Sequence, residues 1–129
     1  MVIVDLSVLM AVLFEEPTAE WVMSQFDAYG HNLLMSTVNL AETMIMLRNR
    51  HKDSASVEAT EHDLIDSELR FIAPTVEHAR LAAMARDRFP LNLGDCFAYA
   101  LSVTQNCPIL TLDEDFRRCD RSAIIPSKA

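Results

Sequence analysis

The sequence predicts a three-layer α/β/α sandwich with a mainly parallel central sheet. Short apolar runs rich in β-branched residues are typical of buried strands, and they alternate with longer segments of helical periodicity. Strands separated by helices favour parallel pairing through right-handed crossovers. The 129 residues contain no repeat, low-complexity tract or linker, so we expect a single domain over residues 1–129.

The N-terminal segment predicts one buried strand followed by two helices. Residues 2–4 are all β-branched, which is typical of a strand covered on both faces. Ser7 is the expected N-cap of an apolar, and therefore buried, helix over 8–14. A second helix is expected to carry Pro17 in its first turn and to end at a turn over 29–32.

The middle of the chain predicts another strand and two helices. Residues 33–37 form the expected strand, and apolar residues at helical spacing predict a helix over 38–50. The polar stretch 51–56 is expected to be a loop. An amphipathic helix is expected over 57–67, with Ile65 among its inward-facing residues.

The C-terminal part predicts two helices joined by a loop. The first helix covers residues 76–89 and ends because proline follows it. Residues 91–95 form the expected loop, which leads into a helix over 96–104. That helix is apolar around most of its circumference, so it belongs in the core. The remaining strands are expected at residues 69–73, 109–112 and, as a short edge strand, 124–125.

The charge balance limits the kinds of partner. Eleven basic residues stand against 19 acidic ones, which gives a net charge of −8. This argues against broad electrostatic binding to nucleic acid, which requires a basic surface. RNA stays compatible if bound metal ions supply positive charge, and an acidic body would also suit a basic protein partner. The chain has only two glycines and no glycine-rich phosphate loop.

The cysteines and the N-terminus indicate a cytoplasmic protein. The three cysteines are odd in number and form no C-x-x-C pair, so they predict reduced thiols rather than disulfides or a zinc site. No apolar run is long enough to cross a membrane, and no signal peptide precedes the first strand. We therefore expect no membrane association.

Acidic residues stand at unusual places in several predicted elements. Asp5 ends an apolar strand, Glu42 interrupts an apolar helical stripe, and Asp95 precedes an apolar helix. Asp113, with Asp115 close behind, follows another apolar strand. In an α/β/α sheet such positions can converge on one edge, where repelling carboxylates recruit a cation. Oxygen ligands select hard ions such as Mg²⁺ or Mn²⁺, which assist hydrolysis of a phosphodiester.

Each acid also has an ordinary structural explanation. Asp5 would serve as a helix N-cap, and Glu42 would pair with Arg48 or another cation. Asp95 would complement the dipole of the helix that it precedes. The two aspartates after the last apolar strand would lie in a turn. Sequence alone leaves both explanations open.

Four segments resemble PIN-domain proteins, specifically VapC-type toxins of toxin–antitoxin pairs. They occur in the order and at the spacing of that family and cover both ends and the middle of the chain. The most specific is the block Gly94-Asp95-Cys96-Phe97-Ala98-Tyr99-Ala100. The four segments are residues 2–9, 39–42, 91–100 and 109–116.

The resemblance implies a metal-dependent endoribonuclease. Asp5, Glu42 and Asp95 would act as catalytic residues that bind Mg²⁺ or Mn²⁺, together with a fourth acid after the last motif strand. Asp113 is the first choice because it stands nearest the strand end, and Asp115 is the alternative. The implied substrate is RNA, commonly tRNA or rRNA. The implied partners are a cognate antitoxin and a second copy of the chain in a homodimer, with higher assembly alongside the antitoxin.

The chain departs from the family pattern directly after the first aspartate. Leu6 stands where these proteins usually carry a hydroxyl residue, whereas Ser7 matches the next hydroxyl position. Ser7, Asn92 and Thr111 are assigned supporting roles around the acids. Four arginines are either solvated surface or candidates for contact with RNA phosphates: Arg48, Arg50, Arg117 and Arg118.

Two other functions remain open. The first is a PIN-like module that binds a partner without catalysis, for which Leu6 is the sequence support. The second is a phosphatase that uses Asp5 as its nucleophile. Such phosphatases usually need a second acid two residues later, and Ser7 occupies that position.

Overall fold

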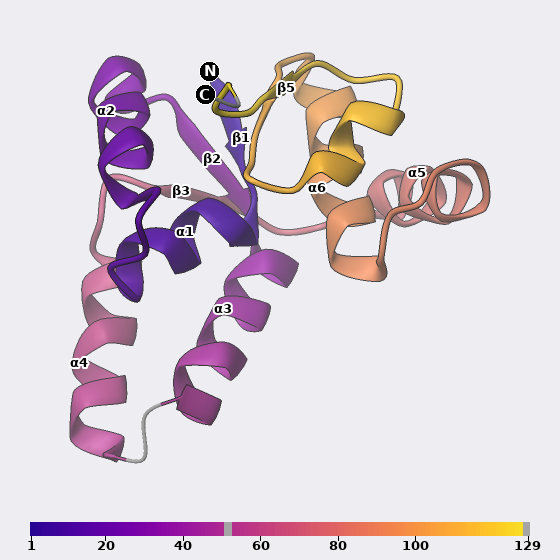
Figure 1. Cartoon of the computed structure of the whole chain (residues 1–129). Coiled ribbons are helices and arrows are strands. Elements are labelled where there is room, and N and C mark those ends of the chain that lie inside the picture. Colours follow the sequence, from indigo (N-terminus) through magenta and orange to yellow (C-terminus); the bar gives the residue numbers. More distant parts are fainter. Residues whose placement is uncertain (51–52, 128–129) are drawn as a thin grey trace.

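Five parallel strands form the centre of the molecule (Figure 1). Their order across the sheet is β3-β2-β1-β4-β5, so β1 lies in the middle. The structure is a computed structural model, and it describes residues 1–50 and 53–127. The strands are β1 (Val2–Val4), β2 (Leu33–Ser36), β3 (Arg70–Ile72), β4 (Ile109–Leu110) and β5 (Ala123–Ile124). The predicted α/β/α sandwich is confirmed.

Helices cover both faces of the sheet (Figure 1). They are α1 (Leu6–Leu13), α2 (Ala19–Tyr29), α3 (Thr37–Arg50), α4 (Ser54–Ile65), α5 (Val76–Arg88), α6 (Leu93–Gln105) and the 3₁₀ helix η1 (Glu114–Arg118). Within the described part of the chain, no helix has the length and apolar character that crossing a membrane requires.

Alternating strand residues divide the core into two halves. Val2 and Val4 pack with residues of α1, α2, α3 and α4, whereas Ile3 between them packs with α5, α6 and η1. The same alternation holds for Ile109 and Leu110 of β4. Because successive strand residues point to opposite faces, a run of apolar residues is what a doubly covered strand requires.

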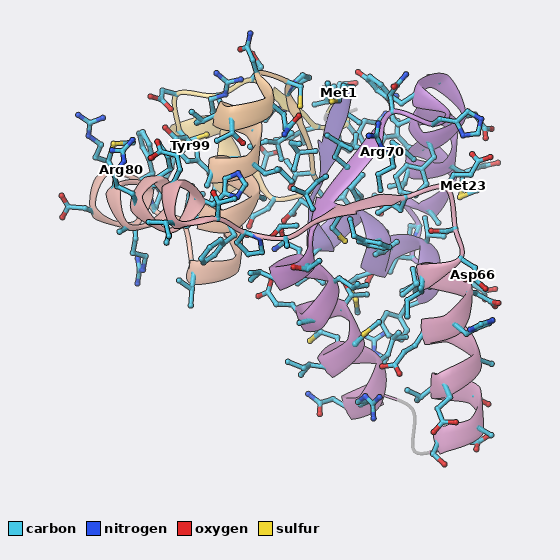
Figure 2. The ribbon with its side chains drawn as sticks, turned by 180° about the vertical axis from the view of Figure 1, so that it is seen from behind. Met1, Met23, Asp66, Arg70, Arg80 and Tyr99 are labelled. Carbon is cyan, nitrogen blue, oxygen red and sulfur yellow. The ribbon has the colours of Figure 1, made fainter. Side chains whose placement is uncertain are left out.

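Helix α6 is the most buried helix of its layer. Its Tyr99 is 2% exposed and packs against Phe89 at the end of α5, with 5.5 Å between the ring centroids. Figure 2, viewed from behind, shows Tyr99 on the side of α6 that faces α5. The Tyr99 hydroxyl donates a hydrogen bond of 2.6 Å to Asp120, which satisfies its polar group.

Several helices begin at other residues than predicted, because the residues that cap them differ from the expected ones. Asp5, not Ser7, is the N-cap of α1. Pro17 precedes α2, whose N-cap is Thr18, so proline lies just before the first turn and not inside it. Helix α6 begins at Leu93 rather than at residue 96, because Asn92 caps it and Gly94 is tolerated in its first turn.

The predicted loop over 51–56 and the helix after it also need correction. Residues 51–52 lie outside the described part of the chain. Asp53 accepts a hydrogen bond from the Ala55 backbone N–H, so α4 already begins at Ser54. Ile65, predicted to face inward, is 55% exposed because it is the last residue of α4.

The topology brings the starts of α1 and α3, together with α6 and η1, to one edge of the sheet. At the carboxyl ends of β1 and β2 the chain turns directly into α1 and α3 (Figure 1). Helix α3 packs against α6, and η1 follows β4 at the same edge. Ligands of open α/β sheets bind at this edge.

Candidate active site

Asp5 lies at the carboxyl end of the central strand and is only 2% exposed. Its Oδ2 accepts hydrogen bonds from the Ser7 backbone N–H (3.3 Å), the Ser7 hydroxyl (2.7 Å) and the Thr111 hydroxyl (2.8 Å). Burial raises the pKa of Asp5 above its ordinary value, although these hydrogen bonds oppose the change. The predicted capping role of Asp5 is therefore correct, and it involves a single oxygen.

The second oxygen of Asp5 differs from the first in its surroundings. Oδ1 is buried, and within residues 1–50 and 53–127 it finds no hydrogen-bond partner. Burying an unpaired polar atom is costly, so native structures rarely keep one without a ligand, water or catalytic use. A carboxylate oxygen in this state suits a cation or a donor-rich ligand.

The two hydroxyls that hold Asp5 are themselves oriented by backbone groups. The Ser7 oxygen accepts a 2.9 Å hydrogen bond from the Leu112 N–H, and the Thr111 oxygen accepts one of 2.9 Å from the Asp113 N–H. Each hydroxyl proton is thereby left for Asp5. Leu6 therefore does not deprive Asp5 of hydroxyl support, since Ser7 and Thr111 supply it from two different elements.

Glu42 reaches the same edge from the second turn of α3. Its Oε1 accepts a 2.9 Å hydrogen bond from the Asn39 side chain. A Cβ atom placed on Gly94 would overlap the Glu42 carboxylate, so any larger residue at this position would force the Glu42 side chain to shift. The predicted alternative, a Glu42–Arg48 pair, is wrong, because Arg48 forms a two-bond ion pair with Glu61 of α4.

Asp95 occupies the first turn of α6 and is 8% exposed. Its backbone N–H donates to the Asn92 side chain at 2.9 Å, and its carboxylate accepts from the Asn92 N–H at 3.4 Å. This reciprocal pair is a capping box, so the predicted supporting role of Asn92 includes fixing the helix start.

The pKa of Asp95 records which charges surround it. Burial is the largest influence, followed by the negative charges of Asp5 and Asp113, with a smaller one from Glu42, and together they raise this pKa to about 7. The Asn92 backbone hydrogen bond opposes the change. The negative charges of Asp5 after β1, Glu42 in α3 and Asp113 after β4 thus all act on Asp95 in α6, as the predicted convergence at one sheet edge requires.

Asp113, rather than Asp115, belongs to this group. The charge of Asp113 raises the pKa of both Asp5 and Asp95. Asp113 also caps η1 by accepting a 2.9 Å hydrogen bond from the Asp115 N–H. Asp115 is exposed, and its contact with Asp113 is made by its backbone N–H.

The donor set fits a hard divalent cation. All four side chains offer carboxylate oxygens, which Mg²⁺ and Mn²⁺ prefer, and Asp5 Oδ1 is a buried oxygen without a partner. Over residues 1–50 and 53–127, no three His, Cys, Asp or Glu side chains stand together as a ready-made metal cluster. The residues therefore fit the ion by chemistry and proximity of charge, and binding requires side-chain adjustment.

Three of the four candidate arginines already have partners in the fold. Arg48 pairs with Glu61, Arg50 lies over the Phe14 ring at 4.0 Å, and Arg117 pairs with Glu114 at 2.6 Å. Arg118 is exposed near the end of η1, a short distance along the chain from Asp113. Arg118 is therefore the arginine best placed for contact with a phosphate.

Sequence reasoning missed one residue of the site. Asn39 is fully buried and lies three positions before Glu42, so both side chains occupy the same side of α3. Its signal was a polar residue on an apolar helical face, next to an acid already singled out.

The fold and this edge define a class: α/β/α proteins with carboxylates gathered at the carboxyl ends of parallel strands. The PIN-domain family model matches residues 2–122. A curated relative, "Ribonuclease VapC" of Mycolicibacterium smegmatis, is 32% identical, with 95% of this chain and 98% of the relative covered. The chain belongs to the PIN-domain family, within its VapC group.

Solved structures share the fold at low identity. The Mycobacterium tuberculosis toxin VapC20, described as cleaving the sarcin–ricin loop, has a TM-score of 0.78 and 16% identity over 98% of this chain and all of that one. VapBC2 of Rickettsia felis, solved with a promoter DNA fragment, has a TM-score of 0.79 and 13% identity, covering 98% and 100%.

Proposed function

We propose that the protein is a metal-dependent endoribonuclease that acts as the toxin of a toxin–antitoxin pair. The observation that carries the proposal is the gathering of Asp5, Glu42, Asp95 and Asp113 at one sheet edge, with Asp5 Oδ1 buried and unpartnered. Membership of the VapC group, in which relatives are named ribonucleases, supports the same reaction class.

In this proposal the four carboxylates hold Mg²⁺ or Mn²⁺. The bound cation would polarise a phosphoryl oxygen of RNA and lower the pKa of a water that attacks phosphorus. Ser7 and Thr111 keep one oxygen of Asp5 occupied and its other oxygen fixed in direction. Asn92 fixes Asp95 by holding the first turn of α6.

The proposed partners follow from the same group. Structural neighbours include toxin–antitoxin complexes, which supports a cognate antitoxin for this chain. We propose tRNA or rRNA as substrate, a homodimer as the working form, and a cytoplasmic location where both RNA and antitoxin are present. Arg118, the exposed last residue of η1, would contact the RNA backbone.

Cleavage of RNA by paired variants tests this function. Purified protein, free of antitoxin, is incubated with total RNA and Mg²⁺ or Mn²⁺, with EDTA as the metal-free reference. We expect discrete fragments that fall by about 100-fold or more in Asp5→Asn, Asp95→Asn and Asp113→Asn. Asparagine is chosen because it still caps helices.

Asp115→Asn is the matched control, since Asp115 lies two residues from Asp113 and is exposed. It should cleave within about twofold of the unmodified protein. Cleavage that survives Asp5→Asn, or no cleavage with either metal, would contradict the proposal. Retained antitoxin binding without cleavage or metal binding would instead favour the non-catalytic module.

A further inference from the structure

Asn39 joins two elements of the acidic edge. Its side chain is 0% exposed, and its Nδ2 donates to Glu42 Oε1 at 2.9 Å and to the backbone carbonyl of Gly94 at 3.1 Å. The first contact is within α3, and the second crosses to the first turn of α6. One amide group therefore connects Glu42 to the turn that carries Asp95.

The orientation of this amide is fixed by its neighbours. Both partners of Nδ2 are acceptors, so a flipped Asn39 would place its own oxygen against two other oxygens. Asn39 Oδ1 consequently faces elsewhere, where it is buried and has no hydrogen-bond partner among the described residues.

The close approach of α6 makes the bridging amide necessary. The Glu42 carboxylate lies in the space that a Cβ of Gly94 would fill. Two oxygen acceptors, from Glu42 and the Gly94 carbonyl, thus meet in a buried gap, and the Asn39 NH₂ group supplies the donors between them. Without that group, Glu42 would have to turn away from α6 to avoid the carbonyl oxygen.

We propose that Asn39 is a positioning residue that sets the affinity of the acidic edge for a divalent cation by holding Glu42 against the first turn of α6. Asn39 itself touches neither cation nor RNA. This role rests on the proposed metal-dependent function.

Mn²⁺ affinity, measured by calorimetry on the intact chain, tests this role independently of RNA cleavage. The four proteins compared are unmodified protein, Asn39→Ala, Glu42→Ala and the double variant. We expect Asn39→Ala to weaken Mn²⁺ binding by about tenfold or more, as loss of a residue that orients a metal ligand typically does. In the Glu42→Ala background the same substitution should change affinity by less than about twofold, because the carboxylate that Asn39 holds is already removed.

Thr43→Ala is the matched control. Thr43 is also 0% exposed on α3, and its hydroxyl donates at 2.8 Å to the Asn39 backbone carbonyl rather than to the Glu42 carboxylate. It should cost stability in thermal unfolding yet keep the Mn²⁺ affinity of the unmodified protein. Asn39→Ser, which retains a donor, should have a Mn²⁺ affinity between those of Asn39→Ala and Thr43→Ala. It replaces Asn39→Ala in the comparison if Asn39→Ala does not fold.

Three results would overturn the role of Asn39. They are unchanged Mn²⁺ affinity in Asn39→Ala, an equal loss in the Glu42→Ala background, or an equal loss in Thr43→Ala. Absence of Mn²⁺ binding by the unmodified protein would also overturn it. Failure of the proposed function is distinguishable, because absent RNA cleavage by the unmodified protein would contradict that function even where Mn²⁺ affinity responds to Asn39→Ala as expected.

Discussion

At the residue scale, the two oxygens of Asp5 have different surroundings. Oδ2 is held by three donors and caps α1, whereas Oδ1 is buried and has no hydrogen-bond partner in the described part of the chain. Two of the three donors come from Ser7 and the third from Thr111, which lies 106 positions away in the chain. The direction of Oδ1 therefore depends on a hydroxyl that only the folded sheet brings near.

Removing the Thr111 hydroxyl tests this dependence. We expect Thr111→Val to weaken Mn²⁺ affinity by about tenfold, because Asp5 loses a hydrogen bond and the Asp113 N–H loses its acceptor. Calorimetry with Mn²⁺ measures the change. Thr60→Val on α4, which removes a hydroxyl bonded within its own helix, is the control and should keep its affinity. Equal affinities in both variants would show that Oδ1 is fixed without Thr111.

At the element scale, the first turn of α6 determines how closely α6 approaches Glu42 on α3. Asn92 starts the helix with a capping box, Gly94 lets Glu42 approach, and Asp95 supplies the next carboxylate. Three different structural roles thus fall within the four residues 92–95. The sequence prediction placed this segment in a loop, because asparagine and glycine are typical of turns as well as of helix starts.

The effect of Gly94→Ala should depend on whether the Glu42 side chain is present. In the unmodified protein we expect Gly94→Ala to displace Glu42 and reduce RNA cleavage by about tenfold or more, since positioning errors are costly in catalysis. A Glu42→Ala background removes the three atoms nearest to the added Cβ, and there Gly94→Ala should stabilise the fold by up to about 1 kcal/mol through helix propensity. Thermal unfolding and cleavage assays measure the two effects. Destabilisation in both backgrounds would mean that Glu42 is not the obstacle.

At the scale of the whole molecule, the gathered carboxylates destabilise the metal-free fold. Asp95 has a pKa of about 7 in the folded chain against an ordinary 3.8, so the folded state holds more protons between these pH values. Its favourable contribution is complete below about pH 4 and is lost as the pH rises through 7. The raised pKa of Asp5 acts in the same direction.

Asp95→Asn should therefore stabilise the metal-free protein at alkaline pH. At pH 8 in EDTA we expect the variant to unfold at a higher urea concentration than the unmodified protein, with a free energy of unfolding that is larger by at most about 4 kcal/mol. This difference should vanish near pH 4. Asp87→Asn on the exposed side of α5 is the control and should show no such pH-dependent gain. A constant difference across this range would contradict the assigned cause.

The overall fold was predictable because its causes are local. The β-branched run at residues 2–4 and the aspartate after it indicate a buried strand and its carboxyl end from the sequence alone. The Asn39–Gly94 contact was not predictable, since 55 positions separate the two residues and helix periodicity does not identify the neighbour that packs there. Ile65 shows the same limit, because an apolar residue at a helix end is not obliged to be buried.

The capping role of Asp5 affects how inactive forms would be obtained in living cells. Under the proposed function, a selection for survivors of a toxic gene would recover changes at Asp5 that abolish RNA cleavage together with changes that spoil folding, because the same side chain caps α1. Changes at Glu42 are cleaner, since its carboxylate accepts from Asn39 and caps no helix. A harmless but intact bait for capturing the antitoxin is therefore better made at Glu42.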